Sequence, residues 1–127
     1  MKIAISAKGR EENSDIDPRF GRCSFFLFID SEKDEFEALV NPATEAAGGA
    51  GIQAAQLMVD KGVEVLITGN VGPNAFQTLN AAKIKIFGGA SGTVKEALGK
   101  YKNGELKEFS AHSVPPHFGM GNKGEKR

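Results

Sequence analysis

Two arginines and the single cysteine of this chain lie within seven residues, Asp17-Pro18-Arg19-Phe20-Gly21-Arg22-Cys23. Forked guanidinium groups bind polyoxyanions and other anionic ligands. Nearby positive charge favours the thiolate form of cysteine, which binds soft metals. We therefore predict that this stretch binds an anionic ligand or a metal. The candidate anion-binding residues are Arg19, Phe20, Gly21 and Arg22, and the candidate metal ligand is Cys23.

Two other interpretations of this stretch stay open. A lone cysteine at the start of a strand is most often a small buried hydrophobic residue. The two arginines can also pair with Asp15 and Asp17 on the surface, without binding any ligand.

Both histidines lie near the C-terminus, and they are the next candidate metal ligands. His112 and His117 would join Cys23 and Met120 in a soft-metal site if the C-terminal segment folds back over the domain. The Pro, Gly and Lys content of residues 111–127 favours the alternative, a flexible tail. We expect a single α/β domain over residues 1–110, followed by this tail.

Sixteen glycines form several clusters, and three loops at residues 6–9, 69–74 and 88–93 are predicted to follow strands. In open α/β sheets, ligands bind beyond the carboxyl ends of the parallel strands. Two of these loops lead into helices, whose first N–H groups and dipole attract anions. The alternative is that glycine only makes tight turns there. The residues predicted to line the site are Gly69, Asn70, Gly72, Asn74 and Gly89.

Three kinds of enzymatic site lack their characteristic residues. Neither G-x-x-x-x-G-K-[ST] nor a G-x-G-x-x-G after the first strand is present, so ATP and NAD are not the expected ligands. The first strand, Lys2–Ser6, carries no carboxylate for a two-metal nuclease centre. No Cys-His or Ser-His-Asp triad is recognisable from spacing. We expect a binding protein that is not an enzyme.

Composition narrows the class of protein further. The chain has 127 residues, 40% of them hydrophobic, and its 16 Lys+Arg balance its 16 Asp+Glu. A zero net charge argues against nucleic-acid binding. No apolar run approaches the roughly 20 residues of a membrane helix, and residues 1–30 do not have the pattern expected of a signal peptide. We expect a cytoplasmic protein with no membrane partner.

The pattern of apolar residues predicts the elements that position these loops. A strand over 23–30 is apolar on both faces, which indicates helices on both sides of the sheet. Later β-α-β units require parallel, right-handed crossovers. We predict a three-layer α/β/α fold with a mixed five-stranded sheet in the order 3-2-1-4-5. The expected strands are 2–6, 23–30, 36–40, 63–68 and 84–87, and the expected helices are 52–61, 73–80 and 93–102.

Taken together, these segments resemble the dinitrogenase iron-molybdenum cofactor biosynthesis family. The likeness covers about residues 1–105. The matching segments are Lys2–Ser6, the stretch from Asp17 to Cys23 with the Phe-rich strand after it, Gly48-Gly49-Ala50-Gly51-Ile52-Gln53-Ala54-Ala55 and Ile67-Thr68-Gly69-Asn70-Val71-Gly72-Pro73-Asn74-Ala75. The resemblance implies a ribonuclease-H-like motif fold without nuclease activity.

The resemblance also implies a function. The implied protein is a small carrier that transiently binds an anionic metal–sulfur cluster, or a precursor of that cluster. The cluster would contain iron, molybdenum or both. The cluster would pass to a cofactor-assembly or acceptor protein, and the carrier would be a monomer or weak homodimer. Two rival functions remain: a regulatory protein-interaction module without bound metal, and an enzyme that binds phosphorylated metabolites.

This chain departs from the family pattern at the element that bears the arginines. Nitrogenase-linked members carry a His-Phe-Gly-His type element where this chain has Arg19-Phe20-Gly21-Arg22, and many relatives carry alanine where it has Cys23. Arginine holds an anion by charge but does not ligate a metal. The departure argues against molybdenum specificity and leaves Cys23 as the candidate direct ligand.

Overall fold

The computed structural model describes residues 1–33, 35–45 and 48–110. The predicted flexible tail 111–127, with the candidate ligands His112 and His117, lies outside the described residues. The elements in chain order are β1 Lys2–Ala7, β2 Phe25–Asp30, β3 Glu35–Val40, the 3-10 helix η1 Pro42–Glu45, α1 Ala50–Asp60, β4 Val65–Ile67, α2 Pro73–Ala81, β5 Lys85–Gly88, α3 Val94–Lys102 and β6 Lys107–Glu108.

The strands form one mixed sheet in the order β3-β2-β1-β4-β5-β6. The pairs β1–β4 and β4–β5 are parallel, whereas β1–β2, β2–β3 and β5–β6 are antiparallel. The predicted order 3-2-1-4-5 is confirmed, but the predicted strand number of five is wrong. The sixth strand is only Lys107–Glu108, both exposed, so it has no apolar alternation to reveal it.

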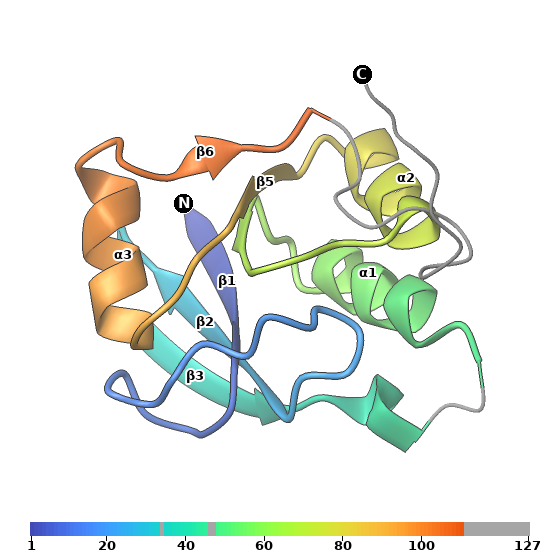
Figure 1. Cartoon of the computed structure of the whole chain (residues 1–127), viewed down its shortest axis with the longest axis horizontal. Coiled ribbons are helices and arrows are strands. Elements are labelled where there is room, and N and C mark those ends of the chain that lie inside the picture. Colours follow the sequence, from blue (N-terminus) through green and yellow to red (C-terminus); the bar gives the residue numbers. More distant parts are fainter. Residues whose placement is uncertain (34, 46–47, 111–127) are drawn as a thin grey trace.

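Helices cover both faces of the sheet, which confirms the three-layer prediction. In Figure 1, α1 and α2 lie on one side of the sheet and α3 lies on the other. Neighbouring residues of a strand point to opposite faces. The strand residues packed toward α1 and α2 include Ala4, Phe26, Phe28 and Leu66. Those packed toward α3 include Ile3, Ile5, Leu27 and Val65.

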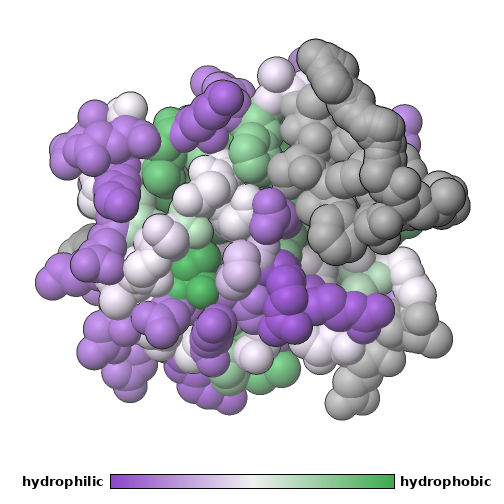
Figure 2. Space-filling view, in the orientation of Figure 1, coloured by the Kyte–Doolittle hydropathy of each residue, from purple (hydrophilic) through white to green (hydrophobic). Residues whose placement is uncertain are grey.

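The surface seen in Figure 2 is hydrophilic over much of its described part, with smaller hydrophobic areas between. Among the described helices, none has the length and apolar character needed to cross a bilayer.

Candidate functional site

The predicted rim exists at the carboxyl ends of β1 and β4, where buried hydrogen bonds hold the long loop after β1. The Ser6 hydroxyl donates to the backbone oxygen of Asp17 at 2.6 Å and shares a 2.7 Å hydrogen bond with the Thr68 hydroxyl. All three residues are buried. Because Ser6 lies near the end of β1 and Thr68 follows β4, the loop is fixed to two central strands at once.

The arginine-bearing loop lies directly against the loop that follows β4. The backbone N–H of Asn70 donates to the Pro18 oxygen at 2.8 Å, and Arg19 and Asn70 form an isolated parallel bridge. A Cβ atom added to Gly69 would lie 2.6 Å from the Pro18 Cα, so the approach of these two backbones requires glycine. The structure therefore brings together Arg19, Gly69 and Asn70, as predicted.

Arg19 forms a two-pronged ion pair with Asp17. Its Nε donates to Asp17 Oδ1 at 3.1 Å and its Nη2 donates to Oδ2 at 3.0 Å. The Asp17 side chain is 1% exposed and the Arg19 side chain is 65% exposed. Burial alone raises the pKa of the Asp17 carboxyl. The hydrogen bonds and charge of Arg19 outweigh burial, so this pKa is lowered. The carboxylate thus holds an exposed guanidinium in a fixed orientation.

Arg22 and Gly21 connect the same loop to the start of α1. Arg22 is exposed, and its Nη1 donates to the Thr44 oxygen at 3.0 Å. A Cβ added to Gly21 would lie 2.8 Å from the backbone nitrogen of Gly51, so the loop crosses the first turn of α1 in close contact. The buried Asn41 side chain donates to the Gly21 oxygen at 3.2 Å. These contacts keep Arg22 beside the N-terminus of α1.

The N-termini of α1 and α2 are adjacent, and both first turns lack an acidic residue. A Cβ added to Gly51 in α1 would lie 3.3 Å from the Ala75 Cβ in α2. Neither helix has an acidic residue in its first turn or a side-chain cap, and Pro73 stands at the start of α2. By contrast, α3 begins with a capping box formed by Thr93 and Glu96. The partial positive charge of α1 and α2 is therefore unopposed by their own side chains.

The other predicted rim residues differ in accessibility. Asn70, Asn74 and Gly89 are exposed, Gly72 is half-buried and Gly69 is buried. The loop after β5 reaches the same rim, because the Gly89 N–H donates to the Gly69 oxygen at 3.0 Å. A hollow of about 330 Å³ lies beside it, lined by Lys8, Asp15, Ile16, Pro18, Ala90, Ser91 and Gly92.

Cys23 lies in the core and not on the rim. It is 0% exposed, and its thiol donates to the Phe20 oxygen at 3.3 Å. Burial raises the pKa of this thiol to about 12, so the thiolate that would bind a metal is disfavoured. Alternation along the expected strand 23–30 would put Cys23 on the same face as Phe25, but the thiol belongs to the cluster that contains Phe26. The assignment of Cys23 as a metal ligand does not fit this placement.

Phe20 also belongs to the core. Its side chain is 2% exposed, and its ring centroid lies 5.5 Å from that of Phe26. Phe20 therefore anchors the arginine-bearing loop and does not line a ligand site, which corrects its predicted role.

Over the described part of the chain, no three His, Cys, Asp or Glu side chains are grouped to hold a metal ion.

Sequence reasoning missed four residues that build the site from beneath: Ser6, Asp17, Asn41 and Thr68. It considered Asp17 only as a surface partner of the arginines. The signal that pointed to it was spacing, because a carboxylate followed two residues later by an arginine can close a local ion pair. No sequence signal indicated that this carboxylate is buried.

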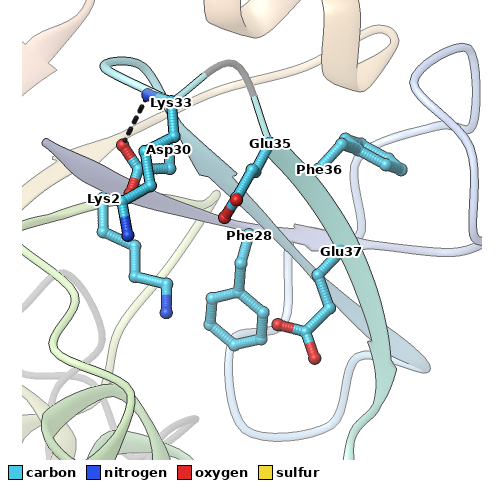
Figure 3. Close-up of a pocket in the computed structure, with 7 residues that line it drawn as sticks. All are labelled: Lys2, Phe28, Asp30, Lys33, Glu35, Phe36 and Glu37. Atoms are coloured by element: carbon cyan, nitrogen blue, oxygen red, sulfur yellow. Dashed lines mark hydrogen bonds between the residues drawn. The ribbon is translucent and has the colours of Figure 1, made fainter.

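A second hollow, of about 420 Å³, lies away from this rim where β1 begins and β2 ends. Figure 3 shows Lys2, Phe28, Glu35 and Glu37 around it. The Lys2 Nζ lies 5.8 Å from the Phe28 ring centroid. No predicted site residue lines this hollow.

Proteins similar to this chain were found by sequence and by structure. The apo form of the orange protein from Desulfovibrio gigas is 36% identical, with 88% of this chain and 95% of that chain covered and a TM-score of 0.85. A NifB-like protein from Thermotoga is 38% identical, with 88% and 96% covered and a TM-score of 0.78. An uncharacterized protein of Methanocaldococcus jannaschii is 29% identical over 112 residues, 86% of this chain and 92% of that protein.

The profile of one protein family matches nearly the whole described part of the chain. It is the profile described as dinitrogenase iron-molybdenum cofactor, and the match spans residues 1–104. The rim loops and the buried contacts that hold them all lie inside this range. The resemblance read from the loop sequences is thereby confirmed: the chain belongs to the dinitrogenase iron-molybdenum cofactor family.

Proposed function

We propose that this protein is a non-catalytic carrier for an anionic metal–sulfur cluster, or for a precursor of it, in iron-molybdenum-type cofactor biosynthesis or trafficking. The observation that carries the proposal is the meeting of three positive features on one rim. These features are the Arg19–Arg22 loop and the N-termini of α1 and α2, neither of which has an acidic residue in its first turn.

The electrostatics favour an anion with several charges. Each helix N-terminus acts as about half an elementary positive charge. Asp17 offsets the charge of the Arg19 guanidinium but also fixes the orientation of that group. The Arg19 side chain stays largely exposed and still presents N–H donors to solvent. A cluster whose sulfur atoms carry negative charge would accept these hydrogen bonds at its periphery.

The donor set favours reversible binding. Arg19 and Arg22 do not ligate metals, and the thiol of Cys23 is buried. The cluster would therefore arrive with its metals already coordinated by its own ligands, and the protein would hold it by charge and hydrogen bonds. Such binding exchanges faster than thiolate ligation, which suits a carrier that must release its cargo to an acceptor protein.

The first test is anaerobic reconstitution with iron, sulfide and molybdate, followed by gel filtration and metal analysis. We expect metal to elute with the wild-type protein and to be lost from the Arg19→Ala/Arg22→Ala variant. Arg10→Ala is the matched control, since Arg10 is an exposed arginine that lies over the Phe25 ring, 4.8 Å from its centroid. A metal-free wild type, or a double variant that retains as much metal as wild type, would refute the proposal.

A second pair of variants separates charge from folding. Gly72 precedes α2 with extended backbone, and a Cβ there would meet no atom within 4 Å. Asp and Asn are both good N-cap residues, so Gly72→Asp and Gly72→Asn should keep or raise stability. Only the aspartate adds negative charge to the rim. We expect Gly72→Asp to lose the bound metal and Gly72→Asn to retain more of it.

A further inference from the structure

The outer edge of the sheet is the β3 strand, and no other strand pairs with its free side within the described residues. Its sequence, EFEALV, contains neither proline nor lysine, two residues that commonly protect an edge strand from pairing. Figure 3 shows Phe36 pointing away from Glu35 and Glu37, on the opposite face of the strand. The edge thus offers one charged face, one apolar face and a row of backbone groups.

The hydrogen bonds between β2 and β3 fix which backbone groups face outward. The Asn41 N–H donates to the Ser24 oxygen at 3.0 Å, and these two residues continue the register of the β2–β3 pair. Hydrogen-bonded positions alternate along an antiparallel strand. The N–H and C=O groups of Phe36, Ala38 and Val40 therefore point to the free edge.

Phe36 and Val40 are also unusually exposed. Four large hydrophobic residues are exposed in the described part of the chain, and these two, at 42% and 52%, are the pair on β3. They lie on the same face of the strand, two residues on either side of Ala38. An apolar pair placed symmetrically about a central small residue can match a copy of itself.

We propose that two copies of this chain associate through antiparallel pairing of their β3 strands, with Ala38 of each copy on the two-fold axis. This register lets all three outward-facing residues exchange backbone hydrogen bonds across the axis. It also places Phe36 of each copy opposite Val40 of the other. A shift by two residues in either direction leaves one of the three residues unpaired and removes the contact between Phe36 and Val40.

The charged face of β3 tolerates this register. Glu37 lies opposite Leu39 of the second copy, and Glu35 lies opposite Asn41, so no glutamate directly faces another. Glu37 also has a positive neighbour in its own chain, since its Oε2 lies 3.4 Å from the Lys61 Nζ. Like charges directly opposite each other would destabilise a strand pair, and this register avoids them.

The first experiment measures mass in solution by light scattering over a concentration series from about 1 µM to 1 mM. An interface of this small size is expected to dissociate with a constant on the order of 10–100 µM. The mass should therefore rise with concentration toward twice the 13.5 kDa of the chain. A mass that stays at that of the single chain throughout would overturn the proposal.

Two variants of the edge should weaken the dimer without disturbing the fold. Phe36→Lys places a charge on the apolar face, and Ala38→Pro removes an N–H that β2 does not use. Each should raise the dissociation constant at least about tenfold. The matched control is Val59→Lys on α1, where the wild-type side chain is 36% exposed. Edge variants that dimerise as well as wild type would show that another surface is used, and would overturn the proposal.

Disulfide cross-linking tests the register itself. Hydrogen-bonded residues in an antiparallel pair have Cα atoms about 5.5 Å apart, within the about 4.4–6.8 Å that a disulfide spans. Ala38→Cys should therefore link to itself on oxidation. Phe36→Cys should not, because the two copies of residue 36 lie about 13 Å apart along the strands. It should link instead to Val40→Cys in a mixture. The reverse pattern would overturn the register.

Discussion

Replacing the Asp17 carboxylate by an amide of the same shape, Asp17→Asn, tests whether this buried group holds the arginine-bearing loop. The carboxylate accepts hydrogen bonds from the backbone N–H, Nε and Nη2 of Arg19, at 3.0–3.1 Å. An amide keeps one oxygen and turns its NH2 group toward at least one of these donors. The variant therefore loses the ion pair and gains a contact between two donors in a buried position.

The size of the expected loss of stability depends on the fact that only Asp17, and not Arg19, is buried in this ion pair. Hydrogen bonds to charged groups contribute about 1.5–3 kcal/mol each, and breaking a fully buried ion pair costs about 3–5 kcal/mol. The Arg19 side chain is 65% exposed and stays hydrated when the pair is broken, whereas that of Asp17 is 1% exposed. The lower end of the range therefore applies, and we expect the free energy of unfolding to fall by about 2 kcal/mol at pH 7.

The effect should depend on pH in a defined direction. The pKa of Asp17 in the folded chain is lowered from 3.8, because the contacts with Arg19 outweigh the opposing effect of burial. A carboxyl with a lowered folded-state pKa stabilises the fold fully above its unfolded-state pKa. That contribution is lost as the pH falls through the folded-state pKa. The stability difference between wild type and Asp17→Asn should therefore shrink as the pH falls below 3.8.

Urea unfolding followed by far-UV circular dichroism provides the assay, since the chain contains no tryptophan for fluorescence. Asp15→Asn is the control, because Asp15 is exposed and precedes Asp17 by two residues. We expect this control to stay within about 0.5 kcal/mol of wild type. If Asp17→Asn also stays within that limit at pH 7, the buried carboxylate does not anchor the loop and the reasoning is wrong.

Three further predictions concern the packing around the site. Gly69→Ala would place a Cβ 2.6 Å from the Pro18 Cα and should cost about 1–3 kcal/mol in urea unfolding. Gly99→Ala, inside α3 and with no atom within 4 Å of the added Cβ, should not lower stability, and equal midpoints for the two variants would contradict this. The pKa of the buried Cys23 thiol is raised to about 12, so this thiol should react with a disulfide reagent at least about 100-fold more slowly in the native protein than in urea. Rapid labelling of the native protein would disprove the burial of Cys23. Thr93→Ala removes the capping box of α3 and should lower the free energy of unfolding by about 1 kcal/mol. The same urea titration measures this change, and an unchanged midpoint would argue against the cap.

The central architecture could be predicted from sequence because its signals are local and strong. The Phe-rich strand β2 is apolar on both faces, and this alone indicated helices on both sides of the sheet. Glycine-rich loops after β4 and β5 identified the rim. The strand β6 could not be found, because Lys107–Glu108 pairs with β5 only through backbone hydrogen bonds that leave no pattern in the side chains.

The site was predicted in part, and its misplaced residues have a common cause. Strand alternation placed Cys23 on the face of Phe25, but β2 begins only at Phe25, and the turn before it brings the thiol to the other face. Phe20 was read as a ligand-lining residue because it stands between arginines. Burial of Phe20, Cys23 and Asp17 depends on contacts with distant segments, which spacing along the chain does not record.

The helices α1, α2 and α3 differ in whether side chains cap their first turns. This difference links ligand binding to the time that a molecule of the protein survives in the cell. The first turn of α3 is completed by its own side chains, whereas those of α1 and α2 are not. An anion bound at the N-termini of α1 and α2 interacts only with the folded chain, so its binding raises the free energy of unfolding. The increase is about 2.7 kcal/mol when the concentration of free ligand is about a hundred times the dissociation constant. Under the proposed function, the empty carrier would unfold more often than the loaded one. Cellular proteases would then remove empty molecules preferentially, and the abundance of the carrier would follow the supply of its cargo.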